Sequence, residues 1–515
     1  MPYMIGLDVG TSGAKALLIN ERGVVLASAT HTYPLSAPKP LWSEQDPEDW
    51  WRASCQSISE VVSESGVDNK EVAGIGLTGQ MHGLVLLDKN GEVLRPAILW
   101  NDQRTAEECK LITETIGFDT LLEITGNPVL PGFTAPKILW VKRHEPEIYE
   151  QIAHILLPKD YVRYRLTGEF AIDVADASGT SLLNVEQRDW SSEMLHALDI
   201  PDEWLPDVYE SVEVTSEINK KRGGQSGLSP GTSVVAGAGD QAAGGVGSGT
   251  VSEGIVSVVL GTSGVVFAHT DQLSVEPEGK LHAFCHAVPE AWHVMGVTLS
   301  AAGSLRWFHD TLGIEEQNVG AETGKDSYEL LTQEAAKISP GSEGLVFLPY
   351  LTGERTPYPD PDARGVFYGL TSRHTKAHMT RAVMEGVGFS LLDCLELIRD
   401  LGITASQIRI SGGGAKSDLW KQILADIFQT ELVTLSTTEG APFGAALLAG
   451  VGTSVYENVR EACDAAISIS SLTHPNGKIN KIYRDYYQIY RELYPSLKDK
   501  FKETSNLVNK YEEFN

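Results

Sequence analysis

The sequence has few cysteines and no long hydrophobic segment. Five cysteines are scattered through 515 residues, at Cys55, Cys109, Cys285, Cys394 and Cys463. An odd, scattered set argues against the disulfide framework of small secreted domains. No apolar run approaches the roughly 18 residues that a membrane-spanning helix needs, and the chain opens into a strand-like segment rather than a signal peptide. We therefore expect a cytoplasmic protein with no membrane partner.

Basic residues are also scarce. The chain carries 41 Lys and Arg residues against 69 Asp and Glu residues, which gives a formal net charge of −28. Nucleic-acid binding needs a basic face that neutralises phosphates, so no nucleic-acid partner is expected. The charge does not exclude an anionic small molecule that is held by backbone amides and a metal ion. We interpret the acidic excess itself as a contribution to solubility.

The features that are present indicate an α/β protein with more than one domain. The chain is too long for one ordinary core, and its 42% hydrophobic and 21% charged residues are typical of globular proteins. Strand-like and helix-like stretches alternate along the whole chain. At the start, strands are expected at 4–10, 14–20 and 24–30, followed by a helix at 47–66.

A repeated tetrapeptide suggests how the chain is divided. Gly-Thr-Ser-Gly occurs at 10–13 and again at 261–264, each time between apolar runs. Around the second copy the opening pattern returns, with strands expected at 254–261 and 264–270. We infer that one large domain is repeated once, as an N-terminal domain over 1–249 and a C-terminal domain over 250–515.

The repeated turns have the composition of phosphate-binding loops. Their glycines tolerate conformations that aim successive backbone N–H groups into one concavity, and their Thr and Ser residues add hydroxyl donors. An ordinary hairpin turn explains a single copy, but two copies favour a pair of phosphate sites for one nucleotide. The residues concerned are Gly10, Thr11, Ser12 and Gly13 in the first copy and Gly261 and Thr262 in the second.

Asp8 lies at the end of an apolar strand, directly before the first of these turns. A carboxylate at that point can reach a phosphate-bound Mg²⁺ through water. The alternative is a turn-initiating Asp that bonds its own backbone. Next to a phosphate turn we favour the metal role.

A third glycine-rich turn, SGGGAKSDLW at 411–420, separates a predicted strand from a predicted helix. It is no P-loop, because Ala415 and Ile410 stand where that motif needs glycines. Gly413 and Gly414 allow a close approach of backbone to ligand, and Ser417 can cap the following helix. An adenosine-binding turn fits this pattern better than a plain turn or a helix C-cap.

The segment VVAGAGDQAAGGVGSG at 234–249 formally matches the dinucleotide fingerprint G-x-G-x-x-A. Three features argue against that function: Asp240 would face the pyrophosphate, the following helix is rich in glycine, and no acidic residue ends a second strand about 20 residues on. We favour Asp240 as a general base that accepts a proton from a substrate hydroxyl. The alternative is that it caps a helix.

The segment 282–293 contains three histidines and a cysteine, which raises the question of a zinc site. Strand alternation sends His282 and Cys285 to opposite faces, and no second pair has metal-ligand spacing. We therefore expect these side chains in the core or at an interface.

Two further stretches, 132–144 and 365–385, match signature patterns of the FGGY carbohydrate kinases. Together with the turns above, they make the chain resemble this family over roughly residues 3 to 490. The resemblance implies two ribonuclease H-like domains, of the actin and hexokinase type of ATPase, flanking a central cleft. It also implies a small-molecule sugar as substrate, with ATP and Mg²⁺. Within the family, GQMHG and ILWNDQR are similar to the branch that phosphorylates the 5-hydroxyl of D-xylulose.

The resemblance also implies roles for single residues. Asp240 falls on the proton acceptor of the family and Asp8 on a carboxylate important for activity. Many members of the D-xylulose branch carry Asn where this chain has Gln241, which bears on sugar preference rather than on catalysis. A homodimer is one expected assembly. The residues implied to contact the sugar are Met81, His82, Asn101, Asp240 and Gln241, and those implied to contact the nucleotide are Gly10, Thr11, Ser12, Gly261, Thr262, Gly413, Gly414 and Asp418.

Three other functions stay open on the sequence alone. A related kinase could act on ribulose, gluconate or glycerol. A non-kinase ATPase of the actin and chaperone superfamily would share the phosphate turns but would not need the motifs GAGDQ and GQMHG. A dinucleotide oxidoreductase is the third, and the arguments given for Asp240 weaken it.

Overall fold

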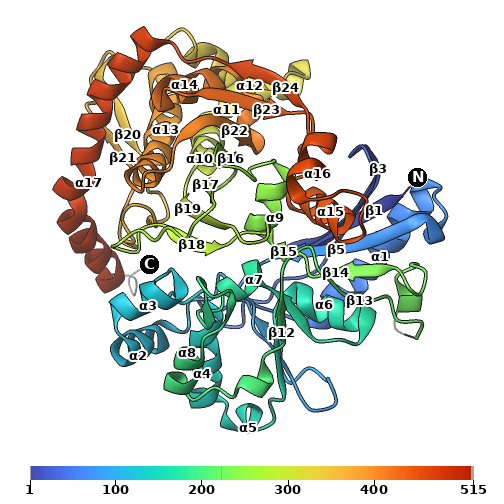
Figure 1. The fold of residues 1–515 in the computed structure, drawn as a ribbon. Helices are drawn as coiled ribbons and strands as arrows, with labels where there is room; N and C mark the ends of the chain where they lie inside the picture. Colours follow the sequence, from blue (N-terminus) through green and yellow to red (C-terminus); the bar gives the residue numbers. More distant parts are fainter. Residues whose placement is uncertain (1, 222, 512–515) are drawn as a thin grey trace. The chain divides into compact units, whose positions relative to one another are not determined.

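The computed structural model describes residues 2–221 and 223–511 (Figure 1). By their internal contacts these residues form two compact units, each discontinuous in sequence. The first unit contains Met1–Ser252, His269–Val294 and Glu439–Ser468, and the second contains Glu253–Ala268, Met295–Thr438 and Ile469–Asn515. The division into sequence domains at residue 249 stays a prediction.

The first unit contains a large sheet, several two-stranded sheets and helices on both faces of the large sheet. Its strands are β1 Tyr3–Val9, β2 Gly13–Asn20, β3 Val25–Thr32, β4 Glu44–Gln45, β5 Val72–Gly79, β6 Val85–Leu87, β7 Ala97–Ile98, β8 His154–Leu156, β9 Ala171–Asp173, β10 Leu183–Asn184, β11 Asp189–Trp190, β12 Asp207–Tyr209, β13 Val214–Glu217, β14 Ser233–Val235, β15 Ala238–Gly239 and β18 His282–Cys285. Its helices are α1 Pro47–Ser65, α2 Ala106–Ile116, α3 Phe118–Thr125, α4 Thr134–His144, α5 Pro146–Tyr149, α6 Pro158–Thr167, α7 Val174–Ser178, α8 Ser192–Leu198, α9 Asp240–Gly247, α15 Ala441–Gly452 and α16 Val459–Ala466.

The large sheet of the first unit has the order β13-β14-β5-β1-β2-β3, and β15 also pairs with β5. Strands β1, β2 and β3 form an antiparallel meander, whereas β14, β15 and β1 run parallel to β5. The three strands and the helix expected at the start of the chain are confirmed as β1, β2, β3 and α1.

Helix α1 shows how local sequence sets the element bounds. Asp46 accepts a hydrogen bond from the Glu48 amide at the N-terminus, Pro47 occupies the first turn, and Gly66 ends the helix in the left-handed conformation. Its apolar side, which includes Trp50 and Ile58, packs on β2 and β3.

Helix α15 covers the opposite face of the sheet at very short range, against β1 and β5. A Cβ atom on Gly6 would overlap the Pro442 carbonyl oxygen, and one on Gly76 would overlap the Ala445 carbonyl oxygen. Glycine at these two strand positions lets the helix backbone rest directly on the strands. The close approach fixes the strands whose ends carry the candidate site.

The second unit has a comparable arrangement of strands and helices (Figure 1). Its strands are β16 Gly254–Leu260, β17 Gly264–Thr270, β19 Trp292–Thr298, β20 Val346–Leu348, β21 Val366–Tyr368, β22 Ala405–Ser411, β23 Glu431–Leu435 and β24 Ile469–Thr473, of which β17 and β19 continue by a few residues into the first unit. Its helices are α10 Ala302–Leu312, α11 Ile314–Thr323, α12 Ser327–Ala335, α13 Lys376–Asp400, α14 Asp418–Phe428 and α17 Gly477–Tyr511.

The second large sheet repeats the topology of the first. Within the second unit, the strands of this sheet follow the order β19-β17-β16-β22-β23-β24. As in the first unit, an antiparallel hairpin, here β16 and β17, is extended by two parallel neighbours and ends on an antiparallel strand. The predicted repeat of one α/β fold is therefore confirmed at the level of strand order.

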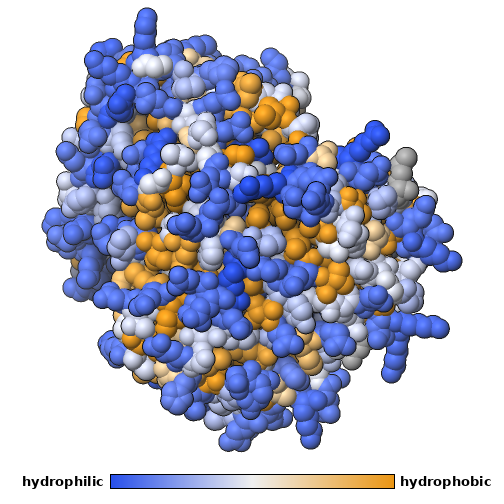
Figure 2. All heavy atoms as spheres, in the orientation of Figure 1, coloured by the Kyte–Doolittle hydropathy of each residue, from blue (hydrophilic) through white to orange (hydrophobic). Residues whose placement is uncertain are grey.

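The exposed surface is mostly hydrophilic in the view of Figure 2, with hydrophobic residues in small groups. None of the helices in the described part of the chain combines the length and the apolar character needed to cross a bilayer.

Candidate functional site

The candidate site in the first unit lies where three parallel strands end. In the sheet register, Asp8 of β1 is opposite Thr78 of β5, and Thr78 is opposite Ala238 of β15. The residues that follow these strands are therefore neighbours: the Gly10 turn after β1, Gln80 to His82 after β5, and Asp240 after β15. Carboxyl ends of parallel strands are a common position for ligand sites in α/β proteins.

The first glycine turn is closed by a hydrogen bond from the Gly10 amide to the Gly13 carbonyl, 3.1 Å. The Thr11 hydroxyl donates to Gln80 Oε1 at 3.3 Å and accepts from Trp100 Nε1 at 2.9 Å. Ser12 is exposed, so its hydroxyl is the more accessible one in this turn. The turn is held in shape by side chains from outside it, which suits a preformed anion site.

Two carboxyl groups with raised pKa values meet at this edge. Burial raises the pKa of Asp8 to about 7, the nearby Asp240 adds to this, and Lys15 opposes it. Burial also raises the pKa of Asp240 to about 6, while hydrogen bonds from Gln241 lower it. Paired carboxyls with raised pKa values are typical of acid–base sites.

Asp240 is the first residue of α9 and does not cap this helix. The N-cap is Gly239, and the described structure shows no side-chain capping bond there. Gln241 Nε2 lies 3.3 Å from Asp240 Oδ1. The structure therefore contradicts the alternative that Asp240 caps a helix. The Asp240 carboxylate is not used in helix capping.

The residues at Asp8 fit a hydrated Mg²⁺. Asp8 Oδ1 is buried and has no hydrogen-bond partner among the described residues. An oxygen of a carboxylate is a preferred ligand of Mg²⁺, which usually keeps several waters and binds few protein groups. A cation at this oxygen would also give it a partner, and burial of a polar atom without a partner costs free energy.

Met81 and His82 follow Gln80 and pack against glycines. A Cβ on Gly239 would lie 2.8 Å from Met81 Cγ, and one on Gly179 would lie 2.5 Å from His82 Nδ1. His82 Nδ1 is 2.6 Å from the Gly179 carbonyl oxygen. Because a carbonyl only accepts, Nδ1 carries the proton in this contact. Met81 thus packs against Gly239, the residue before Asp240, and His82 is fixed by Gly179.

Asn101 is exposed in a turn after Trp100, and Trp100 donates to the Thr11 hydroxyl. Its neighbour Asp102 is fully buried and is bound to Arg104 and to the Ser43 amide. Asn101 can face a ligand, whereas the Asp102 carboxylate is used in an internal ion pair.

The second unit presents its own pair of turns at adjacent strand ends. The turn at Gly261 joins β16 to β17 and is braced by the amides of Ala301, Ala302 and Gly303, which donate to the carbonyls of Gly261 and Thr262 at 2.8 to 3.1 Å. Thr262 is exposed, and its Oγ1 accepts from Arg306 Nη2 at 3.2 Å.

The turn that follows β22 lies next to it, because β16 and β22 are parallel neighbours. Gly414 is buried against Leu260 without room for a Cβ, whereas Gly413 is exposed and has open space around it. The predicted cap is confirmed: Ser417 Oγ accepts from the Trp420 amide at 3.3 Å. Asp418 is exposed and pairs with Lys421, 2.8 Å.

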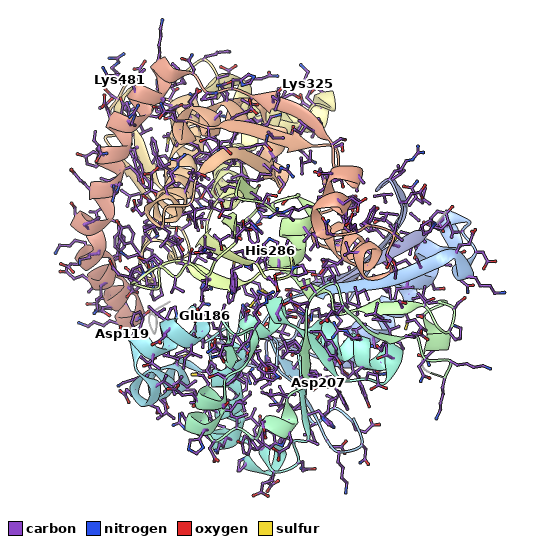
Figure 3. All side chains as sticks on the ribbon, in the orientation of Figure 1. Asp119, Glu186, Asp207, His286, Lys325 and Lys481 are labelled. Atoms are coloured by element: carbon purple, nitrogen blue, oxygen red, sulfur yellow. The ribbon has the colours of Figure 1, made fainter. Side chains whose placement is uncertain are left out.

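The three histidines and Cys285 of the segment 282–293 are buried in the first unit, in agreement with the prediction of core or interface residues. His286, labelled in Figure 3, has its ring centroid 5.2 Å from that of His269 and 5.6 Å from that of His293. Burial lowers the pKa of His293 to about 3 and lowers that of His286 as well, so both are neutral near pH 7. Within residues 2–221 and 223–511, no group of three His, Cys, Asp or Glu residues is arranged to hold a metal ion.

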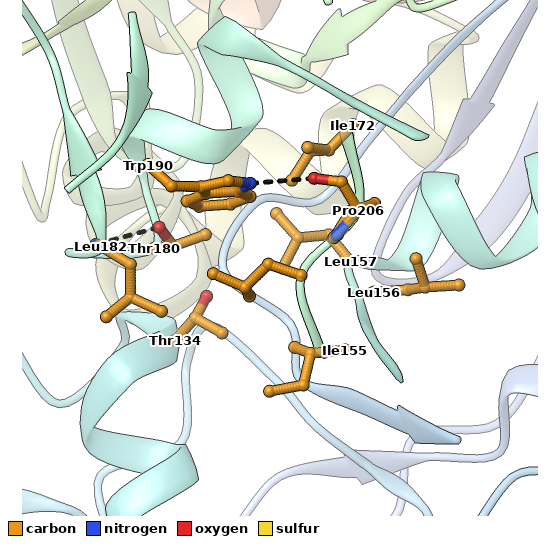
Figure 4. A pocket seen from close by; sticks show the side chains of 10 residues that line it. Thr134, Ile155, Leu156, Leu157, Ile172, Thr180, Leu182, Trp190 and Pro206 are labelled. Carbon is orange, nitrogen blue, oxygen red and sulfur yellow. Dashed lines mark hydrogen bonds between the residues drawn. The ribbon is translucent and has the colours of Figure 1, made fainter. Parts of the chain in front are cut away.

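Two cavities in the first unit lie away from the predicted site residues. One, of about 10 Å³, is lined by apolar side chains around Trp190, Ile155 and Leu182 (Figure 4). The other, of about 290 Å³, is a shallow surface pocket around His154, Phe170 and Trp204. The first is too small for a ligand. We therefore place the candidate site at the strand ends rather than in either of these cavities.

Several residues around the site were not predicted. Gln45 and Gln80 brace the first turn through Thr11 and Gly10, and Gly179 contacts His82. Gln80 precedes Met81 in the motif GQMHG, so its position in this motif could have identified it as a residue of the site. Gly179 is about 100 residues from His82, and only the fold brings them together.

Comparison with known proteins shows the family to which the chain belongs. Residues 3–247 match the N-terminal domain, and residues 256–453 the C-terminal domain, of the FGGY family of carbohydrate kinases. The chain is similar to a xylulose kinase from Escherichia coli (strain K12), at 43% identity over 96% of this chain and 99% of the relative. It is also similar to the crystal structure of a xyloylose kinase from Brucella ovis, with 38% identity, a TM-score of 0.87 and coverage of 96% and 99% of the two chains. A gluconokinase from Bacillus subtilis (strain 168) is 30% identical over 98% of each chain.

Proposed function

The chain belongs to the FGGY family of carbohydrate kinases, and from this we propose that it phosphorylates D-xylulose at its 5-hydroxyl with ATP. The observation that carries the proposal is the strand-end cluster of Asp8, Asp240 and His82 in the first unit. The choice of D-xylulose is supported by the xylulose kinases that are similar over nearly the whole chain. The proposed products are D-xylulose 5-phosphate and ADP.

In the proposed mechanism Asp240 is the general base. Phosphoryl transfer needs the attacking hydroxyl aligned in line with the γ-phosphate and an acceptor for its proton. With a pKa of about 6, Asp240 is mostly ionised at neutral pH and yet basic enough to accept a proton. Gln241 can hold a neighbouring sugar hydroxyl, and Met81 and His82 line the sugar side.

Asp8 is the residue we propose to hold Mg²⁺ through water, and a bound Mg²⁺ would neutralise charge on the transferred phosphate. The unpartnered Asp8 Oδ1 supports this role. The exposed turn residues Ser12, Thr262 and Gly413 are proposed nucleotide contacts of their respective units. A homodimer stays a prediction.

The main competing proposal is a different sugar or polyol. Gluconate is the specific competitor, because a gluconokinase is also similar over the full chain. The test is a panel of D-xylulose, D-ribulose, D-gluconate and glycerol at fixed MgATP. We expect the highest kcat/KM with D-xylulose, and a higher value for any other member would overturn the substrate proposal.

His82→Ala is expected to raise the KM for D-xylulose about tenfold and to leave the KM for ATP nearly unchanged. The His82 ring is fixed by the Gly179 carbonyl, so its loss removes a positioned hydrogen-bonding group from the proposed sugar side. Initial-rate kinetics in both substrates measure this. Equal increases in both KM values, or a large fall in thermal stability alone, would indicate a structural role instead.

The pH dependence of kcat/KM follows from the raised pKa of Asp240. A base must be unprotonated in the free enzyme, so protonation of Asp240 alone is expected to lower kcat/KM about tenfold per pH unit below pH 6. Protonation of Asp8, whose pKa is about 7, acts in the same direction, so the decline begins near pH 7 and becomes steeper below pH 6. The rates should be measured between pH 5 and 8 on enzyme shown to stay folded. A profile that stays flat down to pH 5 contradicts this assignment.

A further inference from the structure

His82 adopts a backbone conformation that is unfavourable for its residue type. Its φ is +67°, in the left-handed region that non-glycine residues rarely occupy. Such a conformation is energetically unfavourable and persists only where surrounding contacts impose it. The contacts that hold His82 are therefore part of the site.

Those contacts come from the start of helix α4. Thr134 Oγ1 donates to the His82 carbonyl oxygen at 3.1 Å, and Lys137 Nζ donates to the same oxygen at 2.9 Å. The Phe133 ring stacks on the imidazole, with centroids 4.5 Å apart. All three residues lie in the stretch GFTAPK at 132–137, the start of the segment that matches a family signature pattern.

Lys137 has unusual surroundings for a lysine. It is completely buried, and its ammonium donates to the carbonyls of His82 and Gly132, at 2.9 Å and 2.7 Å. Within the described part of the chain no carboxylate lies within ion-pair distance of it. Burial lowers the pKa of Lys137 to about 7, although Asp102 opposes this. Burying an amine without a counter-ion is costly, so a purely structural position would favour an apolar side chain.

We propose that Thr134 and Lys137 form a clamp on the His82 carbonyl that sets the affinity and selectivity of the enzyme for its sugar. The proposal rests on the proposed function, since it takes His82 as a sugar contact. The clamp fixes the backbone of His82, and the Gly179 carbonyl fixes its ring. Together they hold the imidazole in one orientation. Thr134 and Lys137 are positioning residues, and they act on the sugar through His82.

The test compares variants that change one donor with little change in volume. Thr134→Val removes the hydroxyl, and Thr134→Ser keeps it. Lys137→Met removes both bonds of the ammonium. The matched controls are Lys142→Met, on the exposed part of the same helix, and Thr125→Val, a buried threonine of the same unit whose hydroxyl bonds Leu121 and Asn127.

We expect Thr134→Val to raise the KM for the preferred sugar about threefold to tenfold and Lys137→Met to raise it at least tenfold. The KM for ATP should stay within twofold. The ratio of kcat/KM for D-xylulose to that for D-ribulose should fall by a similar factor, because a mobile imidazole discriminates less. Thr134→Ser and both control variants should keep the wild-type KM for the sugar and the wild-type ratio of the two kcat/KM values.

The proposal of a clamp is contradicted if Thr134→Val and Lys137→Met lose thermal stability while the KM for the sugar and the selectivity between sugars stay at wild-type values. If Lys137→Met fails to fold, the Thr134→Val and Thr134→Ser pair decides the question. A wild-type enzyme that prefers another sugar would refute the proposed substrate, and the clamp is then tested on the KM for that sugar. Failure of the two proposals is thus distinguishable.

Discussion

Replacing Asp240 with asparagine is expected to lower kcat with D-xylulose by ~10²- to 10⁴-fold, the usual contribution of general acid–base catalysis. The substitution keeps the shape of the side chain and the contact with Gln241 but removes the proton acceptor. Thermal stability should change little, because Gly239 rather than Asp240 is the N-cap of α9. ATP should still bind when measured by calorimetry.

The matched control for this variant is Asp207→Asn, an exposed aspartate on β12 that is labelled in Figure 3. It should keep wild-type kcat. In Asp240→Asn the low-pH limb of the kcat/KM profile should lose the component with a pKa of about 6 and keep the component that comes from Asp8. Near-normal turnover in Asp240→Asn would exclude this residue as the base and leave the strand-end cluster without a proton acceptor.

The second large effect is expected for folding rather than for chemistry. Gly6→Ala should lower the free energy of unfolding by about 3 kcal/mol or more, at or above the upper end of the usual cost of overpacking a core. The added methyl group would overlap the Pro442 carbonyl oxygen, and backbone has little freedom to move away. Either β1 or α15 must shift, and β1 carries Asp8 at its end.

Gly244→Ala provides the control, because a Cβ at this helical position meets open space. It should be neutral or stabilise the protein by up to about 1 kcal/mol, as alanine is the better helix former. Urea unfolding of both variants measures the difference. A Gly6→Ala protein as stable as the wild type would mean that α15 does not rest on β1 as closely as described.

Much of this fold could be predicted from the sequence because the relevant signals are local. Apolar runs around the two Gly-Thr-Ser-Gly turns predicted β1, β2, β16 and β17, and Asp46 and Gly66 lie at the ends of α1. The position of Asp8 at the end of β1 could also be predicted from the sequence. These features depend on residues within a few positions of one another.

The rest of the site depends on long-range pairing that no local pattern shows. The register of β1, β5 and β15 brings Asp8 and Asp240 together across more than 200 residues of sequence. The same holds for the contact of His82 with Gly179, and for the return of α15 to the sheet of the first unit. A glycine in the middle of a predicted strand, such as Gly6, indicates that another backbone segment packs close to it. The sequence does not show which segment this is.

The central claim is that this chain transfers phosphate to the 5-hydroxyl of a ketopentose. The most direct measurement is incubation of the wild-type protein with MgATP and ¹³C-labelled D-xylulose, followed by NMR of the product. We predict stoichiometric ADP and a single sugar phosphate with phosphorus coupling at C5. Release of ADP without a sugar phosphate, or phosphate attached at another carbon, would contradict the claim.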